Sequence, residues 1–555
     1  MERRLSQFFT EEIAQKVRLI EKVFKGKDKT LREDTLGAGE ISLLERTDDP
    51  VITGLEYDSR KVKPGNIFFA LSGLHTDGHT YIPDAINRGA AVIVHQNEVA
   101  SFEKKICYLK VQNSRFAMSA IADAFYQFPS QHLAIIGVTG TEGKSTTVYL
   151  IYQLLALLGK KAGFISTVQY GDGESVYWND KHETTPEAVV IHKLLADMRR
   201  HGVEYAVIEA SSHGLSPRTN RLGDVAFDVG VMTNVNHEHL EFHGSWDQYR
   251  NDKANLFRAL DDNLLGHVKL PPFSSAAGKV HEPQPLPCFG VVNGDDPSAV
   301  YFAQATKHKT YTFSTRGGNA DISLRSVYSH ADGNWYEVFI RESALVMDIR
   351  DQLPGMFNAG NVLASLLTVS QLLSIPVESI LLLTPYFKPV RGRMTPVKKG
   401  QPFEIIVDYA HTPHSFEMLF PVLRERMDKQ RGGRIIALFG SAGERDTEKR
   451  KEQGKIASQW SDIIILTDED PRGEVPLNIL KEIASGVENH REGENLFLVP
   501  DRPAAVRVAL VHAQKGDLIL LLGKGHENSI IYSDRVMPYD EIGEAEKALA
   551  ELGYK

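Results

Sequence analysis

The chain has 555 residues, of which 42% are hydrophobic and 24% charged, a composition typical of a soluble globular protein with three or four domains. Its formal charge of −9 argues against a general nucleic-acid or anionic-membrane binder, because such proteins need a basic surface. Two cysteines, Cys107 and Cys288, are too few for a disulfide scaffold or a thiolate metal cluster.

The first part of the chain, residues 1–50, is expected to be an N-terminal extension. Charged and apolar residues alternate there at helical spacing, which predicts an amphipathic helix followed by a charged turn and an irregular lead-in. No apolar stretch of the sequence approaches the roughly 20 residues of a membrane-spanning helix, and no segment resembles an export signal. We therefore expect a cytoplasmic protein.

A first domain is predicted over residues 51–129. Short apolar runs at 66–71 and 90–94 predict strands, and residues 114–128 predict a helix that ends at Pro129. The boundary of the domain is placed at that proline, because proline cannot continue the helix.

A central domain, residues 130–394, alternates buried strands with helices, which predicts a parallel sheet covered on both faces. A C-terminal domain, residues 395–555, shows the same alternation, and residues 265–288 are expected to form a surface excursion. The predicted strands are 132–138, 205–209, 229–233, 403–407, 434–439, 462–467 and 517–522, and a helix is predicted over 145–158.

A glycine-rich segment, Gly137–Thr146, joins the first central strand to the predicted helix. In this context backbone N–H groups and the helix N-terminus face an anion. Lys144 can reach terminal phosphates and the Ser145 hydroxyl can hold Mg²⁺. The strict pattern would place glycine where Val138 stands, yet the strand–GKS–helix context predicts ATP or GTP binding without specifying the reaction.

Further motifs flank the phosphate loop on both sides. Together they resemble the Mur ligase family, whose members join an amino acid to a muramyl peptide with ATP. The resemblance extends across nearly the whole chain from Asp58, and its last motifs are similar to the branch that adds a diamino acid to UDP-MurNAc-L-Ala-D-Glu. The motifs are Asp58-Ser-Arg60, Asp77-Gly-His79, Glu183-Thr-Thr-Pro186, Glu209–Leu215, Thr233–Gly244, Tyr249–Phe257, Asn293-Gly-Asp-Asp296, Phe357–Asn361, Gly392-Arg-Met394, Asp408–Pro413 and Gly523-Lys-Gly-His-Glu527.

The resemblance implies an α/β fold of three domains, with a central P-loop ATPase-type parallel sheet and a Rossmann-like C-terminal domain. A carboxylate is a poor electrophile, so it would be activated as an acyl phosphate, a reaction that depends on positioning and on charge neutralisation by Mg²⁺. The implied ATP-binding residues are Gly140, Thr141, Glu142, Gly143, Lys144, Ser145, Thr146 and Asn293.

Four residues are expected to carry the chemistry: Lys144, Glu209, His239 and Lys253. Ser145 and Glu209 suit a first Mg²⁺, since both offer oxygen ligands. The resemblance adds His239 as a ligand of a second Mg²⁺, and Lys253 as a carbamylated lysine that orients it. Two positions depart from the family pattern, because Glu142 replaces the usual Asn and Glu238 the usual Asp.

The UDP-muramyl substrate is expected to span two domains. By resemblance Ser59 and the loop around His75 are the uridine and diphosphate contacts. In the central domain Thr184, Thr185, Ser211 and Arg221 match contacts to the muramyl dipeptide, with Arg218 as the competing arginine. Arginine suits this role because it binds a carboxylate through two hydrogen bonds.

The C-terminal domain is expected to bind the incoming amino acid. Arg472 favours meso-diaminopimelate, which has a distal carboxylate, whereas Asp470 in place of the family's Asn favours a distal ammonium, as in lysine or ornithine. We expect meso-diaminopimelate, with L-lysine and L-ornithine as alternatives. The amino-acid contacts implied by the resemblance are Arg445, Glu469, Asp470, Arg472, Gly523 and Glu527.

Other functions fit the sequence less well. A folylpolyglutamate- or cyanophycin-type ligase would share the central domain, but the N-terminal Asp58 and Asp77 motifs are expected where a UDP-sugar binds. A non-catalytic nucleotide-binding regulator would be expected to have lost one of the four chemical residues, and a plain P-loop phosphotransferase leaves the third domain unexplained. We therefore expect a monomeric ligase of peptidoglycan precursor synthesis, with ATP, a UDP-muramyl dipeptide and a diamino acid as its partners.

Overall fold

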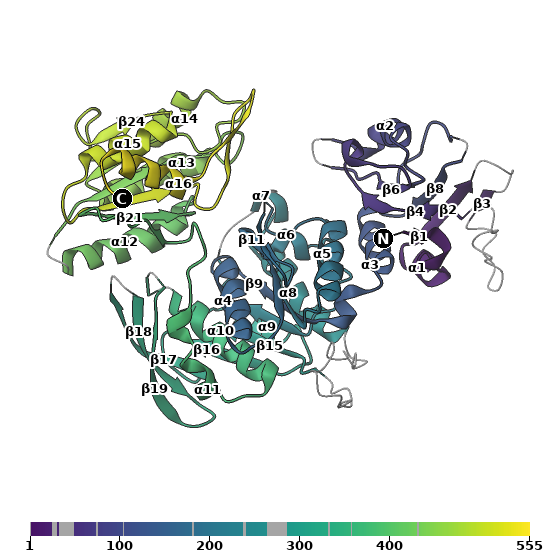
Figure 1. Cartoon of the computed structure of the whole chain (residues 1–555), viewed down its shortest axis with the longest axis horizontal. Helices are drawn as coiled ribbons and strands as arrows, with labels where there is room; N and C mark the ends of the chain where they lie inside the picture. Colours follow the sequence, from purple (N-terminus) through teal and green to yellow (C-terminus); the bar gives the residue numbers. More distant parts are fainter. Residues whose placement is uncertain are drawn as a thin grey trace. The chain divides into compact units, whose positions relative to one another are not determined.

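The computed structural model describes most of the chain and falls into two compact units (Figure 1). One unit comprises Met1–Arg325, Val338–Met347 and Ala359–Leu383, and the other Ser326–Glu337, Asp348–Asn358 and Thr384–Lys555. The residues described are 2–24, 30–32, 49–73, 76–103, 105–179, 183–236, 240–262, 286–330, 333–353, 355–356, 358–429 and 432–555. His75, His239 and most of the expected 265–288 excursion lie outside them.

The N-terminal part of the first unit is a sheet flanked by helices. Strands β5 to β8 run parallel and lie next to one another in the order β8-β7-β6-β5, because their apolar residues are buried on both faces. Helix α3 packs its alanine-rich face into the same core. The elements are α1 (Glu11–Lys16), β5 (Gly54–Glu56), β6 (Asn66–Phe69), α2 (Ile82–Asn87), β7 (Val92–His95), β8 (Cys107–Val111) and α3 (Ser114–Phe125), with β1 (Arg3–Arg4) and β4 (Val51–Ile52) paired separately.

The prediction of an amphipathic helix in the N-terminal segment is mostly wrong. Among the described residues of this segment, α1 is the one α-helix and a 3-10 turn (Leu5–Gln7) precedes it. Strand β2 (Leu19–Phe24) follows α1 and pairs antiparallel with β8 and with β3 (Thr30–Arg32). The residues of β2, Leu-Ile-Glu-Lys-Val-Phe, come as apolar and charged pairs, a pattern that suits a helix as well. The backbone partners offered by β8 and β3 make the segment a strand between them. Part of the segment expected to be an extension therefore adds two strands to the N-terminal sheet.

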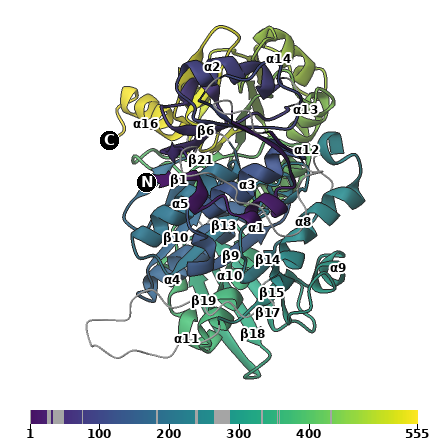
Figure 2. The ribbon, with the colours of Figure 1, turned by 90° about the vertical axis from the view of Figure 1, so that its right-hand side faces the viewer.

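The central sheet has eleven strands within the described residues, and its core is parallel as predicted. The predicted strand at 205–209 is β13 (Tyr205–Glu209), and those at 132–138 and 229–233 are β9 and β14, shifted by one or two residues. Strands β10, β13, β9, β14 and β15 follow one another across Figure 2. In order the strands are β12 (Val176–Trp178), β11 (Gln169–Gly171), β10 (Ala162–Ile165), β13, β9 (Ala134–Thr139), β14 (Val229–Met232), β15 (Phe289–Asn293), β16 (Thr310–Ser314), β17 (Ile322–His330), β18 (Gly333–Ile340) and β19 (Leu345–Asp351).

Helices cover this sheet. Helix α4 packs on β10 and β13, whereas α5 and α8 contribute to a core with Phe227, Val292 and the buried residues of β13. The predicted helix over 145–158 is α4, which begins one residue earlier, at Lys144. The helices are α4 (Lys144–Leu157), α5 (Ala188–Arg200), α6 (Ser212–Leu215), α7 (Leu240–His243), α8 (Trp246–Asp261), α9 (Ala299–Ala303), α10 (Asn358–Leu373) and α11 (Val377–Leu381).

The C-terminal part is a six-stranded sheet within the described residues, with strand order β20-β21-β25-β22-β23-β24 and all neighbours parallel except β20 and β21. Helices α12 to α14 cover one face, and α15 and α16 cover the other, as predicted for an α/β domain. The elements are β20 (Thr395–Pro396), β21 (Glu404–Asp408), α12 (Pro413–Lys429), β22 (Ile435–Phe439), α13 (Glu448–Trp460), β23 (Ile463–Leu466), α14 (Pro476–Ala484), β24 (Leu496–Leu498), α15 (Arg502–His512), β25 (Leu518–Leu522), β26 (Ser529–Ile531), β27 (Val536–Pro538) and α16 (Glu541–Glu551).

Helices long and apolar enough to cross a membrane are missing from the part of the chain that the structure describes.

Candidate active site

The phosphate loop turns sharply between β9 and α4, and glycine is required at two of its positions. Gly140 has φ +149°, and a Cβ atom there would lie 1.9 Å from the Thr233 hydroxyl oxygen. Gly143 has φ +79°, and its Cβ would lie 2.3 Å from the Asn361 amide oxygen. Both contacts are far below any real Cβ distance, so the loop can approach β14 and α10 this closely only with glycine.

The side chain of Asn234, two residues after β14, holds the loop although no role was predicted for it. Its Oδ1 accepts the backbone N–H groups of Thr141 (3.2 Å) and Glu142 (2.9 Å). Lys144, at the first turn of α4, donates to the Thr141 carbonyl at 2.7 Å, and Asn293 donates to the Thr233 carbonyl at 2.9 Å. These bonds fix the loop as a preformed turn at the N-terminus of a helix, where an anion is favoured.

Ser145 and Glu209 meet beside this loop, as expected for a shared metal. Glu209 ends β13 with 1% of its surface exposed, and its Oε2 accepts the Ser145 hydroxyl (2.9 Å) and the Thr167 N–H (2.8 Å). Both of these donors to the carboxylate are neutral, so burial of its charge calls for a cation. Two hard oxygen ligands fit Mg²⁺.

Other metal ligands are not assembled in the described residues. No cluster of three or more His, Cys, Asp or Glu side chains forms a metal site there, and His239, the expected ligand of a second metal, falls in the undescribed stretch 237–239. The fit to a metal therefore depends on Ser145 and Glu209 alone.

Lys253 reaches the phosphate loop from helix α8. The side chain is 2% exposed, its Nζ donates to the Gly140 carbonyl at 2.6 Å, and it lies 4.4 Å from the centre of the Tyr249 ring. The Tyr249 hydroxyl is 3.0 Å from the Thr141 hydroxyl, so two residues one helical turn apart contact the same loop. The sequence alone would suggest that Lys253 is a solvated surface lysine. In the structure it is instead buried beside the nucleotide loop.

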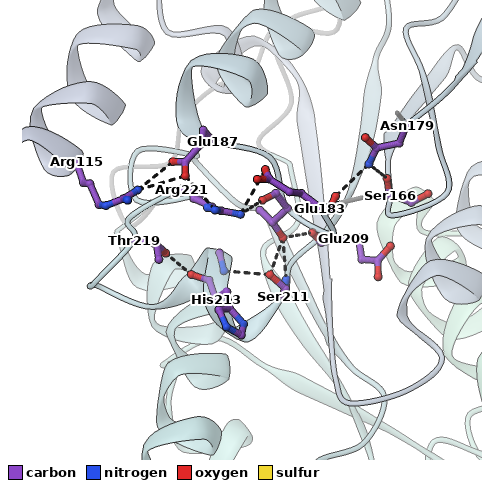
Figure 3. A network of polar contacts seen from close by, with 12 residues as sticks. Arg115, Ser166, Asn179, Glu183, Glu187, Glu209, Ser211, His213, Thr219 and Arg221 are labelled. Carbon is purple, nitrogen blue, oxygen red and sulfur yellow. Dashed lines mark hydrogen bonds and ion pairs between the residues drawn. The ribbon is translucent and has the colours of Figure 1, made fainter. Parts of the chain in front are cut away.

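The residues expected to bind the muramyl dipeptide form one cluster near Glu209 (Figure 3). The Thr185 hydroxyl donates to the Glu209 carbonyl (2.9 Å) and lies 2.9 Å from the Ser211 hydroxyl, which caps α6. Thr184 precedes Thr185 on the loop before α5 and is half-buried. The cluster is polar and adjoins the Ser145–Glu209 pair, so a carboxylate bound there would lie near the phosphate loop.

The structure separates the two candidate arginines. Arg221 donates to the Thr185 carbonyl (2.6 Å) and to the Glu187 carboxylate (2.9 Å), while its buried Nε–H has no acceptor among the described residues. Arg218 instead donates to the Phe242 carbonyl at 2.7 Å. Arg221 is therefore the arginine that joins the cluster, where its guanidinium also pairs with Glu183 at 3.6 Å.

A cleft of about 1060 Å³ opens in the first unit between the N-terminal sheet and the central domain. Asp58, Lys61, Asn179 and Pro186 are among the residues that line it. Ser59 follows Asp58, is 7% exposed, and hydrogen bonds through its hydroxyl to Asp84. Residues next to Ser59 and next to Thr185 therefore line the same cleft. Ser59 and Thr185 themselves are expected to contact opposite parts of one substrate.

In the second unit, three loops carry the residues expected to bind the amino acid. They follow β22, β23 and β25, and parallel neighbouring strands bring their carboxyl ends to one edge, where α/β sheets bind ligands. Glu469 and Asp470 are buried, Arg472 is half-buried, and Arg445 is exposed. Gly523 comes so close to Glu469 that its Cβ would be 3.2 Å from Oε2.

The charges of these loops are paired in a way that the sequence did not predict. Lys524 is fully buried and contacts Asp470 (2.9 Å) and Glu527 (2.5 Å), and the Tyr409 hydroxyl donates to Glu527 at 3.3 Å. Burial away from water raises the pKa of the Glu469 carboxyl. Its Oε2 has no hydrogen-bond partner among the described residues. The second motif residue, Asp470, is thus already bound to an ammonium of the chain itself.

A phosphate loop in a parallel central sheet, with one sheet before it and a second parallel sheet after it, defines a nucleotide-binding α/β protein of three parts. Three protein-family models match these parts in chain order. They are described as "Mur ligase family, catalytic domain" (residues 51–126), "Mur ligase middle domain" (138–269 and 274–369) and "Mur ligase, glutamate ligase domain" (392–525). The chain belongs to the Mur ligase family, as the resemblance predicted.

Similar proteins share nearly the whole length of the chain. The UDP-N-acetylmuramyl-tripeptide synthetase of Treponema denticola is 47% identical, over 90% of this chain and 94% of that protein. The UDP-N-acetylmuramoyl-L-alanyl-D-glutamate--2,6-diaminopimelate ligase of Geobacillus kaustophilus is 34% identical, over 91% and 96%. The solved structure of a 2,6-diaminopimelate ligase of the same name has a TM-score of 0.57 and 25% identity, over 91% of this chain and 96% of that one.

Proposed function

We propose that the protein is an ATP-dependent ligase that adds a diamino acid to the D-Glu carboxylate of UDP-MurNAc-L-Ala-D-Glu, in peptidoglycan precursor synthesis. The observation that carries the proposal is the Ser145–Glu209 pair beside the phosphate loop, with the Thr185–Ser211–Arg221 cluster adjoining it. The 47% identity to a protein named as a tripeptide synthetase supports this choice of substrate.

In this proposal each group has a stated task. Lys144 and the loop N–H groups bind the ATP phosphates, while Arg221, Thr185 and Ser211 orient the carboxylate that attacks the γ-phosphate. Bound Mg²⁺, at two sites, would neutralise charge on the phosphates, with Ser145 and Glu209 at the first site and His239 at the second. Carbamylated Lys253 would supply a negative charge to the second site.

The amino group then attacks the acyl phosphate and releases phosphate, so one amide forms for each ATP that becomes ADP. Arg445, Glu469, Arg472, Gly523 and Glu527 belong to the site that binds the amino acid. Arginine at 472 supports meso-diaminopimelate, with L-lysine or L-ornithine as the alternatives. Ser59 and His75 bind the uridine diphosphate, and the enzyme acts as a monomer.

The test supplies the purified full-length chain with ATP, Mg²⁺ and UDP-MurNAc-L-Ala-D-Glu, and offers diaminopimelate, lysine and ornithine in separate reactions. We expect one of them to give ADP in step with a nucleotide-linked peptide that is heavier by one residue, measured by mass spectrometry. Lys144→Ala should abolish ADP formation, whereas Lys160→Ala, on the exposed end that follows α4, should not. ADP release without a heavier product for any amino acid would contradict the proposal.

A further inference from the structure

One buried cation of the second unit has no role in the expected chemistry. Lys524 follows β25 and its side chain is 0% exposed, although lysine is among the residues least often buried completely. Its Nζ lies 2.9 Å from Asp470 Oδ1 and 2.5 Å from Glu527 Oε2. The lysine thus joins side chains of two loops, one after β23 and one after β25, at the edge where the amino acid is expected to bind.

The two carboxylates differ in what else holds them. Asp470 Oδ1 also accepts a hydrogen bond from the Ile531 N–H at 3.0 Å, so both donors to this oxygen belong to the protein itself. Glu527 is contacted at Oε1 by the Tyr409 hydroxyl, 3.3 Å away, and at Oε2 by Lys524. The position of the Glu527 carboxylate therefore depends on an ammonium that Asp470 in turn holds in place.

The backbones of the two loops are joined by another residue. Arg502 is fully buried and donates to the carbonyls of Asp468 (3.0 Å) and Leu522 (2.7 Å), the residues that precede each loop. The Glu541 carboxylate pairs with its guanidinium. Because Arg502 already ties the strand ends, loss of Lys524 should disturb the side chains of the site more than the course of the chain.

We propose that Lys524 is a positioning residue of the amino-acid site: it holds Glu527 ready to receive the ammonium of the incoming amino acid, and Asp470 acts through Lys524 rather than on the substrate. This inference rests on the proposed function. It applies to whichever diamino acid the enzyme accepts, because every amino acid brings an ammonium group. The three charges sum to one negative charge, which suits a cationic group at Glu527.

The test measures steady-state kinetics of full-length variants with the diamino acid that the wild type accepts. Lys524→Met removes the charge at similar length and should raise KM for the amino acid about 30-fold, while KM for ATP stays within about twofold. Adding Asp470→Asn removes one of the two carboxylates that Lys524→Met leaves without their ammonium partner. The double variant should therefore have a KM for the amino acid about threefold lower than that of Lys524→Met. Lys455→Met, an exposed lysine of α13, is the matched control and should behave as the wild type.

A folded Lys524→Met variant with unchanged KM for the amino acid would overturn the inference, and so would equal rises in KM for the amino acid and for ATP. If Lys524→Met does not fold, the double variant is compared with Asp470→Asn alone, and we expect the double variant to have the higher KM for the amino acid. Equal values for these two would overturn the inference. Absence of any product with the wild type would instead contradict the proposed function, so the two failures are distinguishable.

Discussion

The hydroxyl of Ser145 lies 2.9 Å from a carboxylate oxygen of Glu209, although the two residues are 64 positions apart. Neighbouring parallel strands explain the contact, because β9 leads into the phosphate loop that carries Ser145 and Glu209 ends β13 beside it. The topology of the parallel sheet therefore brings a buried carboxylate and a hydroxyl together at its carboxyl edge. Both groups face the turn where phosphates bind.

Glu209→Gln should lower kcat about 100-fold and raise the Mg²⁺ concentration needed for half-maximal rate, because a neutral amide binds Mg²⁺ more weakly than a carboxylate. The measurement is ADP release as a function of Mg²⁺ concentration. Glu204→Gln, a half-buried glutamate just before the same strand, is the control and should leave both values near those of the wild type. An unchanged Mg²⁺ dependence in Glu209→Gln would count against Glu209 as a ligand.

Gly143→Ala should weaken ATP binding at least about tenfold, whereas Gly159→Ala should not. Both glycines have positive φ, +79° and +72°, so each substitution carries a backbone cost of about 1 kcal/mol. Only at Gly143 does the new methyl group collide with a side chain, that of Asn361, since nothing lies within 4 Å of the Cβ position at Gly159. Calorimetric titration with a non-hydrolysable ATP analogue measures the difference, and equal affinities would show that the close approach of the loop is not needed.

Lys253→Ala should lose activity by at least about 100-fold, because Lys253 contacts the phosphate loop directly. If the lysine acts as a carbamate, a short carboxylic acid such as acetate should restore part of the rate, as measured by ADP release. Ethylammonium should restore it instead if the lysine acts as the ammonium that binds the Gly140 carbonyl. Lys307→Ala, at an exposed position, should keep the wild-type rate.

Much of the fold was predictable because buried parallel strands are continuous apolar runs, as in β13 and β25. The N-terminal strand β2 was not, since its sequence pattern suits a helix as well and its partner β8 lies more than 80 residues away in sequence. Ser145 and Glu209 were expected at one Mg²⁺ because both offer oxygen ligands, and their side chains meet in the structure. The roles of Asn234 and Lys524 could not be predicted, because each depends on a contact with another loop that no local spacing encodes.

The choice between the two arginines is open to a direct test. Arg221→Met should raise KM for UDP-MurNAc-L-Ala-D-Glu about 10- to 100-fold, because Arg221 contacts the Thr185 segment that is expected to hold the substrate carboxylate. Arg218→Met should change the same KM by less than about threefold, since Arg218 contacts the Phe242 carbonyl. The reverse order of effects would assign the carboxylate to Arg218. KM for ATP, measured in parallel, shows whether either change is confined to the muramyl substrate.

Asp468 makes the stability of the protein depend on pH. Burial raises the pKa of its carboxyl to about 6, with the Tyr532 hydroxyl as a partial compensation, whereas in the unfolded chain the pKa is about 3.9. Between these values the folded state binds more protons than the unfolded state, so rising pH lowers stability through this window. Above the window the ionised, buried carboxylate leaves the folded state less stable.

Asp468→Asn removes this titration. Relative to the wild type, the variant should therefore gain about 2 kcal/mol in unfolding free energy between pH 4 and pH 7. Melting midpoints of the two proteins across this range measure the gain, and the curves should diverge as pH rises from 4 to 6 and then run parallel. Asp428→Asn, an exposed aspartate of α12, should track the wild type throughout. If the Asp468→Asn curve also tracks the wild type, the carboxyl of Asp468 titrates at its ordinary pKa, and burial at the end of β23 does not hold its proton.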